Sequence, residues 1–455
     1  MKPITIQRID FGTPEGTTAL GKLRSLLGSQ GNVVSDKGRA LTEKVFGQAL
    51  TPQQVVERVC NDVRTRGREA LFHYTRQFDQ VTLTPETFRV KPEELKAAHE
   101  SVEPAFLDTI RRIRNQVFTF QKSLLHRDAS YVSEGKYRLG MRYRPIRRAG
   151  VMVPGGAAAY PSTLLMTICP AQAAGVAELA VVMPPTPMGS YNPYLLAVCQ
   201  ELGIGEVYRI GGSQAVAALA YGVEGIAPVD MIVGPGNLFV ALAKKHVYGE
   251  VAIDCIAGPS EVVVIADDST PPGYVAADMI AQAEHAPGSS VLVSWHPALF
   301  DAVEKELEQQ LSRLDRGDLA RSSLESFGAF VLTRNEEEAA QCTNQLAPEH
   351  LHIATRNPEK LGDRIDNAGA IFLGNFTPVA LGDYAAGPSH VLPTGGTARF
   401  ASGLSVNDFL HRSSILSFTR EGLADMAADT ILLARQEGLT GHAGSVEVRL
   451  DNKNR

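Results

Sequence analysis

The feature that most constrains this fold is an alternation of short apolar segments, glycine-rich turns and helical stretches that begins near residue 147. The apolar segments include "AGVMVPGG", "ELAVVMPP", "EVYRIGG" and "VDMIVGPG". This order is typical of βαβ units in a parallel sheet, with room for a nucleotide-sized ligand at the strand ends. A second such series runs from "SEVVVIAD" to "AIFLG". We therefore predict two α/β halves, joined near residues 256–261.

The charge and hydropathy of the chain exclude several classes of function. The 44 Lys and Arg residues against 50 Asp and Glu give a net charge of −6, so no excess of positive charge favours nucleic acid or an acidic membrane as partner. No apolar run reaches the roughly 18 residues of a membrane span, and the N-terminus lacks the apolar core of a signal peptide. We expect a cytoplasmic, globular protein that acts on a small molecule.

The five cysteines are widely spread, odd in number and without a CxxC pair. This spacing predicts neither a disulfide framework nor a cysteine zinc site.

The regions outside the two α/β series have different patterns. The first 150 residues are predicted to be mainly helical, and in residues 51–78 Thr51 is expected to cap a helix that has Pro52 at its first position. From Pro378 the composition changes to Gly, Ser, Ala and Thr, which predicts an extended surface segment. One long helix around "DMAADTILLARQEG" and a charged tail follow it.

A pair of possible metal ligands lies in "AADMIAQAEHAPG". Gln282 and His285 are three residues apart on the expected last turns of a helix that Pro287 stops, so they share a face. Their oxygen and nitrogen donors could hold one cation such as zinc, although a surface cap or a core histidine is the simpler interpretation of the pair alone. Asp383 in "LGDYAAGPSH" and His442 in "EGLTGHA" could join them only if the fold gathers all four.

Glu349 and His350 are adjacent in "LAPEHLHIAT", between apolar residues where burial penalises charge unless it has a partner or a task. If "HLHIAT" is a strand, His350 and His352 point to one face and the intervening apolar residues to the other. A histidine there is suited to accept protons near neutral pH, and the carboxylate could activate a water. An ordinary pair at a loop edge remains the alternative.

Paired glycines mark two of the turns, 211 and 212 in "IGGSQA" and 234 and 236 in "VGPGN". Each pair follows an apolar strand and opens a helix, where backbone amides and the helix dipole favour phosphate. Neither turn is a GxGxxG fingerprint, and tight turns use glycine in any case, so these turns alone are weak evidence.

Taken together, these motifs resemble the histidinol dehydrogenase family. The resemblance covers about residues 145–446 and rests on "VPGG", "IGGSQAVAALAYG", "VDMIVGPGN", "AGPSEVVVIAD", "QAEHAPGSS", "LAPEHLHI", "GDYAAGPSHVLPTGGTARFASGLSV" and "EGLTGHA". It implies a zinc enzyme that uses two NAD molecules in succession to oxidise L-histidinol through L-histidinal to L-histidine, the last two steps of histidine biosynthesis.

The resemblance also assigns roles to residues. It implies one zinc per subunit, whose ligands are Gln282, His285, Asp383 and His442. The acid/base pair would be Glu349 and His350. Substrate would contact these four ligands and His350, together with Ser260, His390 and Glu437. NAD would contact Gln214 and Asn237.

The implied chemistry is a pair of hydride transfers. His350 accepts the hydroxyl proton as hydride leaves for nicotinamide, and Glu349 helps to hydrate the retained aldehyde before the second transfer. In this family the metal holds the substrate's amine and imidazole nitrogens, which prevents loss of a reactive intermediate.

From pattern and resemblance we expect an α/β fold of two incomplete Rossmann-like domains with parallel-rich sheets, a helical N-terminal arm and an extended, then helical, C-terminal tail. The expected divisions are an arm at 1–48, a first domain at 49–150 and 260–403, a second, NAD-contacting domain at 151–259, and a tail at 404–455. The family implies a homodimer in which the tail crosses to the partner, so that Glu437 and His442 complete the neighbouring site.

One position departs from the family pattern. Many members carry an aromatic residue just before "VPGG", where it contacts the nucleotide, and this chain has Met152. A methionine can still pack on a ring, and Tyr160 is a candidate to compensate.

Three alternatives follow from the same residues. A zinc dehydrogenase of the same fold could act on another polar alcohol such as a sulfonated diol, although Ser260, His390 and Glu437 suit a cationic amine and an imidazole better. A thiol-dependent aldehyde oxidiser could use Cys255, although no base is adjacent in sequence. A non-catalytic sensor of nucleotide or zinc would not need to keep both acid/base residues.

Overall fold

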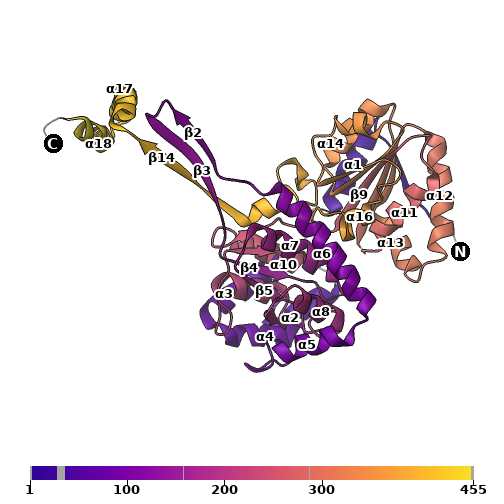
Figure 1. The fold of residues 1–455 in the computed structure, drawn as a ribbon. Coiled ribbons are helices and arrows are strands. Elements are labelled where there is room, and N and C mark those ends of the chain that lie inside the picture. The colour runs from indigo at the N-terminus through magenta and orange to yellow at the C-terminus, as the bar shows by residue number, and fades with distance from the viewer. Residues whose placement is uncertain (1–2, 28–35, 157, 286, 452–455) are drawn as a thin grey trace.

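The computed structural model describes residues 3–27, 36–156, 158–285 and 287–451. Two parallel sheets form its body (Figure 1), one with strand order β1-β11-β10-β9-β12-β13 and the other with order β6-β5-β4-β7-β8. A small antiparallel sheet, β14-β3-β2, extends from them. The predicted α/β fold with two parallel sheets is therefore confirmed.

The six-stranded sheet is covered on both faces, as parallel sheets require. Its strands are β1 (Gln7–Asp10), β9 (Ser260–Ala266), β10 (Gly288–Ser294), β11 (Gly328–Leu332), β12 (His350–Ala354) and β13 (Ala370–Leu373). One face packs on α11 (Pro272–Ala283), α12 (Pro297–Leu311) and α13 (Gly317–Phe327). The other packs on α1 (Pro14–Leu27), α14 (Glu336–Leu346) and α15 (Pro358–Gly362).

The five-stranded sheet is also enclosed by helices. Its strands are β4 (Arg148–Met152), β5 (Glu178–Val182), β6 (Glu206–Tyr208), β7 (Met231–Val233) and β8 (Ala252–Ile253). One face packs on α3 (Pro52–Arg66), α4 (Arg68–Phe78), α9 (Gly212–Tyr221) and α10 (Leu238–Val247), with Phe46 of α2 (Asp36–Phe46) beside them. The other packs on α5 (Pro92–Ser101), α6 (Pro104–Leu124), α7 (Pro161–Ala174) and α8 (Pro193–Glu201).

This packing differs from the predicted division of the chain. Helices within 49–150 bury their apolar faces mainly on the five-stranded sheet, in core clusters whose only buried member from residues 260–403 is Val391 among the described residues. The expected helical arm at 1–48 contains β1, which pairs in parallel with β11 at the edge of the six-stranded sheet. Helical periodicity shows which face of a helix is buried but not which sheet buries it, so the pattern could not decide between the two.

Local signals in the helical region were more reliable. The Thr51 side chain accepts a hydrogen bond from the Gln54 backbone at 3.3 Å, and the Gln54 side chain accepts one from the Thr51 backbone at 3.0 Å. This capping box confirms the predicted helix start. The segment is broken into α3 and α4 at Gly67, whose φ of +59° favours glycine.

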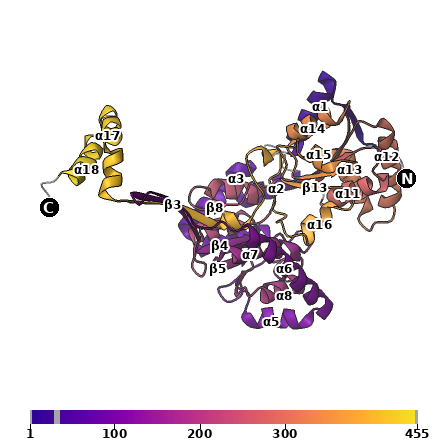
Figure 2. The ribbon, with the colours of Figure 1, turned by 45° about the horizontal axis from the view of Figure 1, so that its top comes forward.

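The C-terminal segment leaves the body along a long antiparallel arm (Figures 1 and 2). The arm consists of β2 (Ala129–Ser133), β3 (Tyr137–Pro145) and β14 (Leu410–Phe418), and α17 (Arg420–Gln436) and α18 (Thr440–Leu450) lie at its far end. Where one helix and a charged tail were predicted there are therefore two helices. The segment after Pro378 also contains the short helix α16 (Val379–Tyr384) and two 3₁₀ turns, η1 (Thr397–Arg399) and η2 (Val406–Phe409). No helix in the described part of the chain is long and apolar enough to cross a membrane.

Candidate active site

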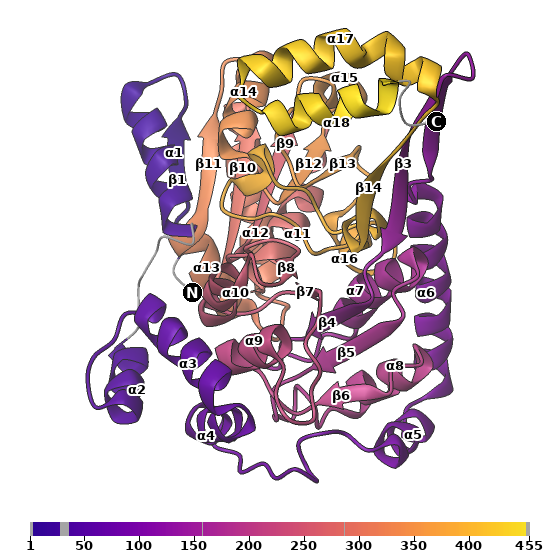
Figure 3. The same cartoon turned by 90° about the vertical axis from the view of Figure 1, so that its left-hand side faces the viewer.

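The candidate residues of the six-stranded sheet lie at the amino ends of its strands. Ser260 is the first residue of β9 and His350 the first of β12, where it pairs with Val262 and Ala370. Gln282 lies near the end of α11, just before β10 begins. Figure 3 shows these strands above the five-stranded sheet. The glycine-rich turns follow β6 and β7 of that sheet.

Glu349 and His350 form a buried pair, with 5 % and 4 % of their surfaces exposed. His350 Nδ1 is 3.5 Å from Glu349 Oε2 and 3.1 Å from the backbone oxygen of Glu261. The Glu261 backbone N–H donates to Glu349 Oε2 at 2.8 Å. An Nδ1–H that donates to a backbone oxygen leaves Nε2 as the acceptor of a neutral ring. The predicted strand is confirmed, and its first histidine has the geometry of a base.

The charges around His350 are unbalanced without a further cation. Its Nε2 is 3.3 Å from Asp383 Oδ1, so the ring lies between two carboxylates. Burial favours the neutral ring, but the charge of Glu349 and the contact with Asp383 raise its pKa to about 10. A cation held by Asp383 would offset one carboxylate and restore the neutral form that a base needs.

Three of the four predicted zinc ligands lie together around α11 and α16, which pack on each other. Asp383 is on α16; burial alone would raise its pKa, but the His350 contact and the nearby His390 and His285 rings lower it overall. Gln282 is buried with no hydrogen-bond partner for its amide Nε2. His285 is exposed in the turn after α11, its backbone N–H donating to the Gln282 backbone oxygen at 3.3 Å. This set of oxygen and nitrogen donors fits zinc.

His390 lies beside Asp383. Its Nδ1 is 2.9 Å from the Asp383 backbone oxygen, and burial lowers the pKa of the ring. His390 therefore places a second imidazole beside Asp383, and burial favours its neutral form.

Glu437 and His442 are not part of this cluster within one chain. Glu437 follows α17 and His442 lies on α18; both are exposed at the far end of the arm (Figure 1). Among the described residues, no three His, Cys, Asp or Glu side chains are grouped to hold a metal ion. One chain therefore brings together three of the four predicted ligands, and His442 lies apart from them.

Sequence reasoning did not identify the contacts of Glu261 with Glu349 and His350, or the partners of His352. Beyond Glu261, His352 is buried with Nδ1 2.6 Å from Asp278 Oδ2 and Nε2 3.0 Å from the Gly374 backbone oxygen. Two signals were available: strand alternation puts His352 on the face of His350, and Asp278 precedes Gln282 by four positions on α11.

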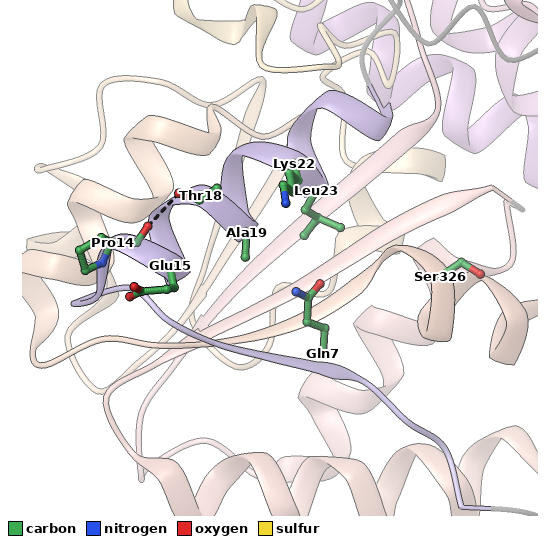
Figure 4. Close-up of a pocket in the computed structure, with 8 residues that line it drawn as sticks. All are labelled: Gln7, Pro14, Glu15, Thr18, Ala19, Lys22, Leu23 and Ser326. Carbon is green, nitrogen blue, oxygen red and sulfur yellow. Dashed lines mark hydrogen bonds between the residues drawn. The ribbon is translucent and has the colours of Figure 1, made fainter.

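A surface cavity of about 520 Å³ lies elsewhere, beside β1 and α1 (Figure 4). It is lined by Gln7, Pro14, Glu15, Thr18, Ala19, Lys22, Leu23 and Ser326. None of these is a predicted site residue, and the lining has no pair of groups comparable to Glu349 and His350.

Comparison with known proteins supports the resemblance. Residues 47–450 match the family model for histidinol dehydrogenase. A histidinol dehydrogenase of Rhodopirellula baltica is 55 % identical over 98 % of both chains, and one of Caldanaerobacter subterraneus is 46 % identical over 87 % of this chain and 92 % of its own. The chain belongs to the histidinol dehydrogenase family. The crystal structure of the histidinol dehydrogenase from Elizabethkingia anophelis, 32 % identical, covers all of both chains with a TM-score of 0.88.

Membership of the histidinol dehydrogenase family confirms the predicted enzyme class, an NAD-dependent oxidoreductase of a family that uses NAD and zinc. The roles of individual residues remain predictions. On the expected NAD side, Gln214 is buried in the first turn of α9 and donates to Asp79 Oδ2 at 3.3 Å. Asn237 caps α10, its Oδ1 accepting from the Val240 backbone at 3.2 Å.

The turn that holds Asn237 has little freedom to change. Gly234 has a φ of +105°, and a Cβ there would lie 2.2 Å from the Met152 backbone oxygen. Met152 itself is 4 % exposed and packs in the core of the five-stranded sheet. Met152, at the position where the resemblance predicts an aromatic residue, is therefore a packing side chain.

Proposed function

We propose that this protein oxidises L-histidinol through L-histidinal to L-histidine with two NAD molecules in succession. The observation that carries the proposal is the buried Glu349–His350 pair, in contact with Asp383 and set in a chain of the histidinol dehydrogenase family. The same residues supply a base, a second acid/base group and part of a metal site.

Gln282, His285 and Asp383 of one subunit would hold zinc, with His442 from a partner subunit. When bound, the zinc would supply a Lewis-acid anchor for the substrate's amine and imidazole nitrogens. His390, Ser260 and the partner's Glu437 would contact the remaining polar groups of the substrate.

The acid/base pair would act twice. In the first oxidation His350 Nε2 accepts the hydroxyl proton while the carbon-bound hydrogen leaves as hydride for nicotinamide. Glu349 then removes a proton from the water that adds to the aldehyde while His350 gives its proton to the aldehyde oxygen, which gives a hydrate and leaves His350 neutral again. In the second oxidation His350 accepts a proton from this hydrate as the second hydride leaves, and the acid is formed.

NAD would bind at the carboxyl ends of the five-stranded sheet. There the turns after β4, β6 and β7 lead into helices, and Gln214 and Asn237 lie in the first turns of α9 and α10. Backbone amides at these helix starts suit the pyrophosphate. The buried position of Met152 implies that the cofactor is not stacked on that residue.

A second copy of the chain would complete the site. The helices at the end of the arm leave Leu432 and Leu433 60 % and 63 % exposed, more than an isolated helix pair is expected to tolerate. The body exposes Ile371, Leu373 and Phe376 on β13 and just after it. An exchange of arms between two subunits would cover both surfaces and deliver Glu437 and His442. On dilution to monomer, zinc content and activity should fall together; a monomer that keeps both would contradict the exchange.

An assay of NADH formation tests the whole proposal. With L-histidinol the protein should produce two NADH per substrate, lose the activity on chelation and regain it with zinc. A sulfonated diol serves as the comparison substrate for the alternative zinc dehydrogenase. Turnover of the diol but not of L-histidinol would refute the proposed substrate, and one NADH per histidinol would refute the second oxidation.

A further inference from the structure

Glu261 contacts both members of the acid/base pair through its main chain. It is the second residue of β9, next to Ser260. Its N–H donates to Glu349 Oε2 at 2.8 Å, and its carbonyl oxygen lies 3.1 Å from His350 Nδ1. These two contacts fix the direction of the Glu349 carboxylate and the tautomer of a neutral His350.

The side chain of Glu261 makes a different contact. Its Oε1 accepts a hydrogen bond of 2.6 Å from the backbone N–H of Gly395, five residues after His390. The Thr394 hydroxyl, one residue earlier, accepts a 2.5 Å hydrogen bond from the Gly258 backbone. Two hydrogen bonds at adjacent residues therefore join the segment 390–396 to the segment 258–261. The acceptor of one of them is a carboxylate.

We propose that the Glu261 carboxylate is a positioning residue that holds the His390 segment against the acid/base pair, so that bound substrate presents its hydroxyl to His350. This inference rests on the proposed function, in which His390 contacts substrate and His350 accepts the proton. A hydrogen bond to a charged acceptor, short and partly shielded from solvent, is strong enough for this task.

The main chain of Glu261 contacts the acid/base pair, whereas its side chain contacts the segment that carries His390. The Ala and Gln substitutions at 261 keep the main-chain groups that contact Glu349 and His350, so the acid/base pair stays in place. Loss of the carboxylate removes the hydrogen bond to the segment that carries His390. The effect should therefore fall on substrate binding and not on proton transfer.

The test compares the Glu261→Ala and Glu261→Gln variants as zinc-loaded dimers. Glu261→Ala should raise KM for L-histidinol about ten-fold, the order expected when a hydrogen bond to a charged acceptor is lost, and lower kcat by less than about three-fold. Glu261→Gln keeps an oxygen acceptor and should recover most of the KM. The pH profile of kcat should keep the wild-type shape in both variants.

Glu308→Ala is the matched control. Glu308 is a partly buried glutamate on the same sheet's α12, and its Oε1 accepts from the Ile4 backbone at 2.8 Å, away from the site. It should lower the thermal midpoint without a change in KM. Should Glu261→Ala not fold, Thr394→Val removes the neighbouring tether at nearly constant volume and should raise KM in the same way.

Several results would overturn the inference. Unchanged KM in Glu261→Ala, a fall in thermal midpoint alone, or a fall in kcat without a rise in KM would each exclude a positioning role, and unchanged KM in Thr394→Val would do so if that variant is needed. His350→Asn and Glu349→Gln, measured beside them, test the proposed function separately. If these two variants lose turnover and Glu261→Ala keeps the wild-type KM, the positioning role of Glu261 is wrong and the proposed function stands. If the two variants keep turnover, the acid/base roles of His350 and Glu349 are wrong.

Discussion

Two regions carry residues predicted to share one active site. One is the buried pair Glu349 and His350, the acid/base corner, and the other is the end of the arm with Glu437 and His442. The two regions differ in how their side chains are held. At the corner, Glu349 and His350 are almost fully buried, and backbone groups of β9 hold both. At the end of the arm, Glu437 and His442 are exposed on helices that bury few of their own side chains. A buried group can be oriented by its own subunit, whereas an exposed one needs another surface to orient it.

The difference extends to charge. The corner has two carboxylates, Glu349 and Asp383, in contact with one imidazole, and their charge raises the pKa of His350 to about 10. Under the proposed function the arm of the partner would add the imidazole of His442, and the metal would add positive charge. In one chain alone the imidazole of His350 therefore faces the two carboxylates.

The largest expected effect is at the buried corner. His350→Asn removes the proton acceptor and should lower kcat about 10²–10⁴-fold, the usual contribution of general acid–base catalysis, with little change in zinc content. Steady-state kinetics and metal analysis of the purified dimer measure the two quantities. A variant that keeps more than a tenth of the wild-type kcat would show that His350 is not the base.

The arm can be tested by subunit complementation. His442→Asn should lose zinc and activity, as His350→Asn loses activity. If arms are exchanged, subunits of the two variants that are mixed and reassociated should regain about a quarter of wild-type activity, since half of the dimers are mixed and each mixed dimer has one intact site. If each subunit uses its own His442, mixing restores nothing.

The corner was more predictable from sequence than the arm. Adjacent Glu349 and His350 in an apolar stretch indicated a buried, partnered pair, and strand alternation indicated which residues share its face. Both are local properties that the chain specifies within a few residues. The glycine turns and the Thr51 cap were predictable for the same reason.

Longer-range features were not predictable from periodicity. The pattern of residues 49–150 did not show which sheet would bury those helices. The edge strand β1 lies within residues 1–48, the segment predicted to be a helical arm. The donor to Glu349 and the partner of His350 Nδ1 are both main-chain groups of Glu261, and a backbone contact leaves no trace in residue type. The second helix of the tail was missed because α18 exposes most of its side chains and shows little apolar periodicity.

A smaller effect is expected on substitution in the buried pair of His352 and Asp278, of which His352 lies two residues beyond His350 on β12. His352 and Asp278 join β12 to α11, and their side chains are 2 % and 7 % exposed. His352→Leu leaves the Asp278 carboxylate buried without its cation and should cost about 3–5 kcal/mol of stability. The double variant with Asp278→Leu should recover part of this loss, as a thermal unfolding series would show; a loss in the double variant equal to the sum of the two single-variant losses would mean that the pair is not coupled.

The same pair gives stability a pH dependence with a definite sign. Burial favours neutral His352, but the contacts with Asp278 and the Gly374 carbonyl raise its pKa above the ordinary 6.5. Its stabilising contribution is therefore complete below about pH 6.5 and decreases as pH rises through the raised pKa of the folded state. The gap in thermal midpoint between wild type and the double variant should narrow as pH is raised. A gap that widens would contradict the charged form of His352.

The smallest effect is expected at Cys255, the nucleophile of the alternative thiol mechanism. Its side chain is 3.5 Å from the Leu392 backbone oxygen, and burial, with the charge of Asp254, raises its pKa to about 12. At neutral pH the group is a buried thiol and not a thiolate, so Cys255→Ala should keep turnover nearly intact and lose about 1 kcal/mol of stability. Cys199→Ala, at a fully buried thiol whose pKa burial also raises to about 12, is the control. Loss of activity at position 255 alone, without unfolding, would restore the thiol mechanism and move the chemistry away from the buried corner.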